Sequence, residues 1–147
     1  MTLADQRWVL LDTDVWSVLF ARSTRTPDAR TETWRNLLVG CGLVIATQTK
    51  AEVLAGLAIN DLGAKRRESI LSQLAGTSRV PVTEDVIVAY ADLTADCKRA
   101  GHALYAKQHT GDRWVAATAI AVGVPLLAGD GIYAGAPGLE ILTDSAH

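Results

Sequence analysis

One stretch, TGDRWVAATAIAVGVPLLAGD at residues 110–130, constrains the fold of this chain more than any other. Residues 112–122 have the length of a helix and are apolar on nearly every face, so this helix must be covered on all sides. The run at 124–128 lies between Gly123 and Gly129 and is too short for a helix, which favours a parallel strand buried on both faces. A helix that leads into a buried strand predicts an α/β fold with this stretch at its centre.

The remaining sequence alternates short apolar runs with segments of helical spacing. It predicts strands at residues 8–11, 43–46, 79–82 and 139–142, and helices at residues 15–21, 31–39, 47–59, 64–74 and 83–100. Such alternation predicts a three-layer α/β/α sandwich around a central, mostly parallel sheet with right-handed crossovers. The helices at 47–59 and 64–74 are joined by a short turn and predict a protruding helical hairpin. This hairpin offers a surface for a dimer or another partner.

Length and composition indicate one ordinary globular domain spanning residues 1–147. A chain of this length with 49% hydrophobic and 5% aromatic residues can bury a single core. Its 14 Lys and Arg against 16 Asp and Glu give a net charge of −2, which neither indicates nor excludes nucleic-acid binding. Cys41 and Cys97 lie far apart, so neither a disulfide framework nor a zinc site is indicated. The sequence suggests no signal peptide and no membrane span, and the cytoplasm is the expected location.

Four carboxylates are predicted to meet at one edge of the sheet. Asp12 and Glu52 come after the first and second predicted strands. Asp112 opens the central helix, and Asp130 comes just after the strand that follows this helix. Because ligands of open α/β sheets bind outside the carboxyl ends of the strands, these four acids are candidates for a common site.

Structural roles compete with this interpretation. An Asp just before a helix often caps it, and Asp14 is the expected cap of the helix at 15–21, which leaves Asp12 for function. Thr49 and Glu52 have the S/T-x-x-E spacing of a capping box, so Glu52 can equally fold back on the start of its own helix. The residues alone leave these two roles of Glu52 open.

Four carboxylates in one cleft repel one another, and either raised pKa values or a bound divalent cation relieves the cost. Oxygen ligands without His or Cys suit Mg²⁺ or Mn²⁺. Such an ion can activate a water and offset charge on a phosphoryl group, so hydrolysis of a phosphodiester is the expected chemistry. His109 lies in the loop just before Asp112. A surface position is expected for it, with contact to a substrate as the alternative.

The chain places DTD at residues 12–14, TKAEVLAG at 49–56, DRWVAATA at 112–119 and PLLAGD at 125–130. This ordered set resembles the PIN-domain ribonucleases, and most of all the VapC-type toxins of bacterial toxin–antitoxin pairs. The resemblance spans residues 10–142 and implies Mg²⁺- or Mn²⁺-dependent endoribonuclease activity on RNA. It also implies a homodimer and inhibition by a small cognate antitoxin protein that inserts into the active-site groove. The family's catalytic, metal-binding acids correspond to Asp12, Glu52, Asp112 and Asp130.

Two positions depart from the usual pattern of this family. Ala128 stands where Thr or Ser is frequent, two residues before the last acid. The missing hydroxyl would orient a carboxylate or a water, so its absence is expected to weaken a second metal site. Asp14 replaces a frequent Asn and adds negative charge near the expected metal.

Two other functions stay open. Asp12-x-Asp14 after a strand, with a late Gly-Asp-Gly, also resembles the first and last motifs of haloacid-dehalogenase-type phosphatases. Asp12 would then be the nucleophile and Asp14 the acid/base, but Glu52 and Asp112 would have no role. The non-enzymatic alternative is a PIN-like module that binds RNA or a protein and has lost efficient hydrolysis, for which Ala128 is the hint.

Overall fold

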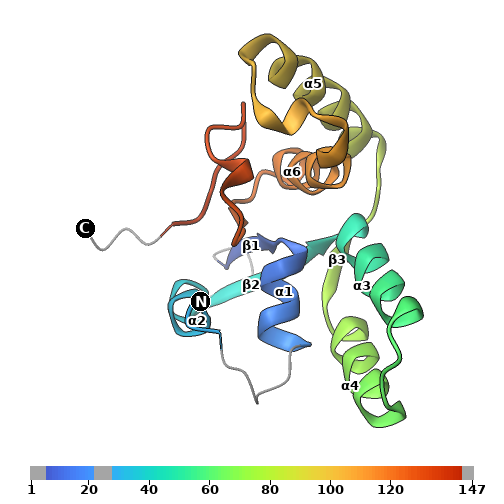
Figure 1. Ribbon diagram of the computed structural model, residues 1–147. Helices are drawn as coiled ribbons and strands as arrows, with labels where there is room; N and C mark the ends of the chain where they lie inside the picture. Colours follow the sequence, from blue (N-terminus) through green and yellow to red (C-terminus); the bar gives the residue numbers. More distant parts are fainter. Residues whose placement is uncertain (1–5, 22–27, 144–147) are drawn as a thin grey trace.

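Within residues 6–21 and 28–143, which the computed structural model describes, a parallel four-stranded sheet lies at the centre (Figure 1). Its strands are β1 (Arg7–Leu11), β2 (Cys41–Ala46), β3 (Ser78–Val80) and β4 (Leu126–Leu127), in the order β3-β2-β1-β4. The chain winds outward from β1 through β2 to β3 and then returns to place β4 on the other side of β1. The direction of winding changes between β1 and β4, which is where open α/β sheets form their ligand crevice.

Helices cover both faces of this sheet. The longer ones are α1 (Thr13–Phe20), α2 (Thr31–Leu37), α3 (Thr47–Ile59), α4 (Ala64–Ala75), α5 (Glu84–Ala100) and α6 (Thr110–Val122). Short 3₁₀ turns are η2 (Ala103–Tyr105), η3 (Lys107–His109) and η4 (Gly131–Tyr133). Figure 1 shows α5 and α6 on one side of the sheet and α1 to α4 on the other. The predicted three-layer α/β/α sandwich is therefore confirmed.

The strand β1 divides the hydrophobic core between these two layers. Val9 and Leu11 pack with α1 to α4, whereas Leu10, between them, packs with α5 and α6. All three side chains are fully buried. Because successive side chains of a strand point to opposite faces, a strand covered on both sides is apolar at every position. This is why β1 reads as an unbroken apolar run that leads directly to Asp12.

The predicted helical hairpin is formed by α3 and α4, which extend away from the sheet (Figure 1). Ile70 and Leu74 of α4 are buried in the same core cluster as Leu57 of α3. Toward the tip the apolar side chains are open, and Ile59 is 82% exposed. None of the helices in the described part of the chain is long and apolar enough to cross a lipid bilayer.

Some boundaries differ from the expectation. The strand expected at 124–128 is reduced to Leu126–Leu127, and residues 139–142 contribute an isolated parallel bridge between Ile141 and Leu126 rather than a strand. The helix α6 starts two residues earlier than predicted and is not covered all round, since Val122 at its end is 44% exposed. The central position of α6 is retained, because α5 and the sheet bury its middle residues.

Candidate active site

Asp12 lies at the carboxyl end of β1, and its side chain is buried. Its Oδ1 accepts a hydrogen bond of 2.8 Å from the Thr13 backbone N–H, so Asp12 is the N-cap of α1. The expectation that Asp14 caps this helix was wrong, because β1 ends at Leu11 and the helix begins at Thr13. Burial raises the pKa of the Asp12 carboxyl to about 6, and the negative charges of Asp112 and Glu52 add to this effect.

Asp112 lies in the first turn of α6 and is held on both of its oxygens. The Tyr133 hydroxyl donates to Oδ1 at 3.1 Å, and the His109 Nδ1 lies 2.9 Å from Oδ2. Tyr133 is only 1% exposed, and burial together with the nearby carboxylates raises the pKa of its phenol well above the ordinary value. The phenol therefore stays protonated and remains a donor to Asp112. His109 is thus tied to the acidic cluster rather than free on the surface.

Glu52 reaches the same cluster from the second turn of α3. Its Oε2 accepts from the Thr13 hydroxyl at 2.5 Å, and its Oε1 accepts from the Gln48 side-chain amide at 3.0 Å. The Thr49 hydroxyl, which is fully buried, lies 3.0 Å from the Thr13 hydroxyl. Since Thr13 has one proton and donates it to Glu52, it accepts from Thr49. The capping-box role of Glu52 was wrong, because α3 begins at Thr47 and Glu52 is too far along the helix to reach its start.

The fourth candidate, Asp130, lies at the margin of this cluster. It is exposed, it caps the turn η4, and its Oδ1 accepts from the Ile132 backbone N–H at 2.9 Å. It is not among the charges that raise the pKa of Asp12. Asp14 also points elsewhere, since its Oδ2 lies 3.4 Å from Nη1 of Arg30. The structure therefore brings Asp12, Glu52 and Asp112 together and leaves Asp130 beside them.

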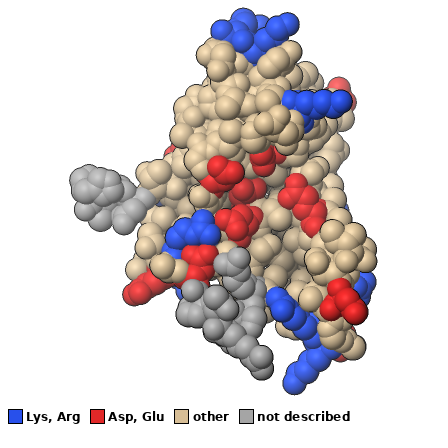
Figure 2. Space-filling view, in the orientation of Figure 1, with Lys and Arg blue, Asp and Glu red and all other residues tan. Residues whose placement is uncertain are grey.

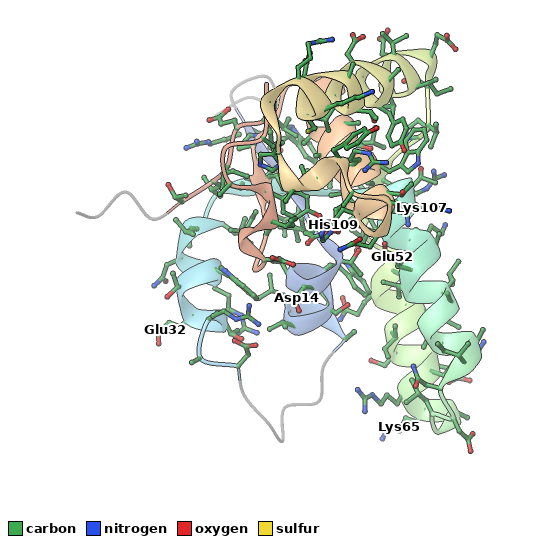
Figure 3. All side chains as sticks on the ribbon, turned by 45° about the horizontal axis from the view of Figure 1, so that its top comes forward. Asp14, Glu32, Glu52, Lys65, Lys107 and His109 are labelled. Atoms are coloured by element: carbon green, nitrogen blue, oxygen red, sulfur yellow. The ribbon has the colours of Figure 1, made fainter. Side chains whose placement is uncertain are left out.

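Figures 2 and 3 show what surrounds this cluster. Figure 2 shows acidic side chains gathered near the middle of one face, with most Lys and Arg side chains further out. Figure 3 shows Glu52 and His109 close to each other where α3 meets the start of α6, whereas Lys65 lies at the far end of the hairpin. Negative charge is therefore concentrated where the carboxyl end of β1 meets α3 and α6.

The donor set at this point fits a hard divalent cation. Asp12, Asp112 and Glu52 offer carboxylate oxygens. Burial, with a smaller contribution from the two neighbouring carboxylates, raises the pKa of Asp12, and a bound cation would relieve this cost of holding negative charge. Among the described residues, no group of three or more His, Cys, Asp or Glu side chains forms a cage that could hold a metal ion. Mg²⁺ commonly binds one or two carboxylates and keeps several waters, so it needs no such cage.

Two contributors to this site were missed at the level of sequence. Tyr133 lies in a glycine-rich segment whose composition indicates only a turn. Thr13 lies between Asp12 and Asp14, which are the more obvious candidates for function. A usable signal for Tyr133 is that it is the one aromatic residue among residues 129–138, three positions after Asp130. No such signal marks Thr13, because its contact with Glu52 joins residues 39 positions apart.

Comparison with known proteins gives a family match. The sequence matches the PIN domain family over residues 9–138. This chain belongs to the PIN domain family. The match covers the site residues Asp12, Glu52, Asp112 and Asp130, and nuclease activity with divalent metal ions is general among PIN domains. No curated protein sequence matches the chain significantly.

Several solved structures resemble this chain over nearly its full length. FitAcB from Neisseria gonorrhoeae is 25% identical with a TM-score of 0.69, covering 92% of this chain and 96% of that one. VapBC2 from Rickettsia felis, bound to a DNA fragment from its promoter, is 15% identical with a TM-score of 0.71, covering 91% and 96%. VapBC-5 from Mycobacterium tuberculosis, of the VapBC family of toxin–antitoxin systems, is 23% identical with a TM-score of 0.61, covering 93% and 98%. The two VapBC likenesses support the fold.

Proposed function

We propose that this PIN domain is a Mg²⁺- or Mn²⁺-dependent endoribonuclease and the toxin component of a type II toxin–antitoxin pair. The observation that carries the proposal is the buried Asp12 at the carboxyl end of β1, with Asp112 and Glu52 close enough to raise its pKa. Membership of the PIN domain family over residues 9–138 supports the same chemistry. The family match gives no role to a covalent aspartyl-phosphate, so the nuclease is favoured over the phosphatase alternative.

Each acid has a separate task in this proposal. Asp12 and Asp112 would hold the cation, and Glu52 would complete or orient its shell of waters. Asp130, which lies at the margin, would act on the metal through a water or on the substrate. A bound Mg²⁺ or Mn²⁺ would lower the pKa of a water and offset the charge that develops on the phosphoryl group. The expected products have 5′-phosphate and 3′-hydroxyl ends.

The remaining residues of the site hold these acids in place. Tyr133 and His109 each bond one oxygen of Asp112, which leaves the carboxylate little freedom to rotate. Thr13 holds Oε2 of Glu52 from the first residue of α1. Because Thr13 directly follows Asp12, this contact ties the positions of two carboxylates together. Such supporting hydrogen bonds fix ligand geometry before a metal or substrate arrives.

The test is cleavage of single-stranded RNA by the purified chain with Mg²⁺, with Mn²⁺ or with EDTA. We expect cleavage with either ion, none with EDTA, and none with either ion for Asp112→Asn. Asp92→Asn, an exposed acid on α5, is the matched control and should cleave like the wild type. Binding of RNA without turnover would indicate the non-enzymatic module. Phosphoryl labelling of Asp12 would indicate the phosphatase.

The proposed partner is a small cognate antitoxin, and the proposed assembly is a homodimer in the cytoplasm. Several solved neighbours are described as toxin–antitoxin complexes or systems, which supports an antitoxin partner. The α3–α4 hairpin offers a surface for the antitoxin. Its exposed apolar side chains include Leu54, Ile59 and Leu71. Expression of the chain alone should arrest growth, and co-expression of a small neighbouring reading frame should restore it. Asp112→Asn should not arrest growth.

A further inference from the structure

A small pocket lies between α3 and α6, beside the acidic cluster. Its volume is about 170 Å³, which is below the roughly 300 Å³ at which sites for whole small molecules begin. It therefore has room for one flat ring rather than for a complete ligand. The residues that line it are Thr47, Gln48, Ala51, Val82, Trp114 and Thr118.

This pocket adjoins the acidic cluster through residues of α3 and α6. Gly111, Trp114 and Thr118 follow one another at intervals of three and four residues, so they share the face of α6 that meets α3. On α3, Gln48 precedes Glu52 by one helical turn, about 6 Å along the axis. The Gln48 amide donates to Glu52 at 3.0 Å and also lines the pocket. Gln48 is therefore the boundary between the pocket and the acidic cluster.

The wall of the pocket on α6 is a fixed aromatic ring. Trp114 stacks on Tyr90 with ring centroids 3.9 Å apart and ring planes 11° apart. Tyr90 is in turn bonded through its hydroxyl to Nη2 of the buried Arg113 at 3.2 Å. Tyr90 itself does not line the pocket. Because the stack with Tyr90 already fixes the Trp114 ring, a second flat group can stack on it without further ordering of the side chain.

Polar groups on the rim add charge and hydrogen bonds. Nη1 of Arg79, an exposed residue, donates to the Thr47 hydroxyl at 2.7 Å, which places a cation beside the pocket. The Gln48 amide offers a donor and an acceptor at the boundary with the acidic cluster. An aromatic face with an amide and a guanidinium beside it is the combination that binds an unpaired base and its phosphate. The nearby carboxylates are where that nucleotide's neighbouring phosphodiester would be cut.

We propose that this Trp114 pocket holds one unpaired nucleobase of the RNA substrate, next to the phosphodiester that is hydrolysed. The inference rests on the proposed endoribonuclease function and adds to it a site that selects single-stranded RNA. Stacking on Trp114 supplies affinity for any base. Gln48 is the residue able to distinguish one base edge from another.

The experiment compares an RNA that the wild type cleaves with a series in which one base at a time is removed. We expect one abasic position near the cleavage site to lower kcat/KM about 5- to 100-fold, the usual strength of a base stacked on an aromatic residue. Trp114→Leu should show the same loss on the intact RNA and no further loss at that abasic position. Ala51→Phe should behave likewise, because it fills the pocket from an exposed position and leaves the Trp114–Tyr90 stack in place.

Ala75→Phe makes the same change at an exposed position of α4 and should cleave every RNA like the wild type. The proposal is overturned if both pocket variants cleave the intact RNA as fast as the wild type. If these normally cleaving variants also fail to bind the antitoxin, the pocket receives a protein side chain instead of a base. Absence of cleavage by the wild type would be a different result, and would overturn the proposed function and this inference with it.

Discussion

The Tyr133 hydroxyl donates a hydrogen bond of 3.1 Å to Oδ1 of Asp112, and it does so from a side chain that is 1% exposed. The two residues come from different parts of the fold, since Asp112 opens α6 and Tyr133 ends the turn η4 after β4. The opposite oxygen of Asp112 faces His109. One of the two contacts that hold Asp112 therefore forms only when η4 packs against α6.

Removing this hydroxyl in Tyr133→Phe should weaken both metal binding and the fold. The phenyl ring refills the buried space, and the lost hydrogen bond to a charged group is worth about 1.5–3 kcal/mol. Loss of a group that orients a metal ligand typically raises the half-saturating metal concentration about 10- to 100-fold. Calorimetric titration with Mn²⁺ and urea unfolding without metal measure the two effects. Tyr105→Phe, at an exposed tyrosine of η2, should change neither, and equal metal affinity in all three proteins would contradict a role for Tyr133.

Asp12→Asn should stabilise the metal-free protein at neutral pH. Asp12 has a pKa of about 6 in the fold against 3.8 without the fold's influence. The folded state thus favours the protonated acid, so this group reduces stability progressively as pH rises from about 4 to about 6. Above pH 6 the reduction is complete, at about 3 kcal/mol for a shift of this size. Asn has no charge to bury and caps a helix as well as Asp does.

Urea unfolding at pH 4.5 and at pH 7.5 in EDTA checks this expectation. From pH 4.5 to pH 7.5, the free energy of unfolding should fall more for the wild type than for Asp12→Asn, because the variant has no carboxyl to ionise at this position. Mg²⁺ should stabilise the wild type more at pH 7.5 than at pH 4.5, because the ion needs the ionised carboxylate. Asp92→Asn is the control for a general effect of removing one acid. If Asp12→Asn is less stable than the wild type at pH 7.5, the burial of charge at this position is not the dominant effect.

Much of the architecture could be predicted because it depends on local patterns. The unbroken apolar run of β1 and the continuous helical spacing of α3, at residues 47–59, are properties of adjacent residues. The site depends instead on where these elements end. Leu11 pairs with Ile45 and Leu127, so β1 stops just before Asp12, which makes Asp12 rather than Asp14 the cap of α1. No local pattern distinguishes these two acids.

The contacts that hold the acids in place could not be predicted from local sequence patterns either. Thr13 meets Glu52, and Tyr133 meets Asp112, because separate elements pack at the same sheet edge. The positions of the acids relative to the predicted strands and central helix identified them as candidates, and the resemblance to a known family favoured the functional role of Glu52 over its capping role. The marginal place of Asp130 and the pairing of Asp14 with Arg30 follow from the loops around β4, whose path the sequence leaves undetermined.

Thr13→Val should slow cleavage and also lower stability by about 1–3 kcal/mol, because the buried Thr49 hydroxyl loses the acceptor to which it donates. The substitution keeps the shape of the side chain and removes the hydroxyl that donates to Glu52 at 2.5 Å. Glu52 is exposed, so its carboxylate can exchange this hydrogen bond for one with water. The rate of cleavage falls because the carboxylate is no longer held in one position. A misplaced catalytic group commonly costs about 10- to 100-fold in rate. Thr13→Ser, which keeps the hydroxyl, should restore most of the rate in the same RNA assay, and failure of this rescue would count against the positioning role.

Gly111→Ala should separate stability from activity, because the two respond in opposite directions. Gly111 lies in the first turn of α6, where a Cβ would come within 3.0 Å of Nε2 of Gln48 and 3.1 Å of Oε1 of Glu52. Both atoms end flexible side chains, so they can move aside at little cost. Alanine in a helix is favoured over glycine by up to about 1 kcal/mol, and we expect the melting temperature to stay constant or rise. The displaced Glu52 should nevertheless lower the rate of RNA cleavage.

Gly56→Ala provides the matched comparison for this variant. Gly56 lies within α3, and a Cβ there would meet nothing nearer than Nδ2 of Asn60 at 4.0 Å. This substitution gives the same gain in helix propensity without disturbing Glu52, so it should raise stability and leave cleavage unchanged. If both variants cleave RNA at the wild-type rate, the position of Glu52 does not limit the reaction. If only Gly111→Ala is slow while both are stable, the close approach of α6 to Glu52 is part of the active site.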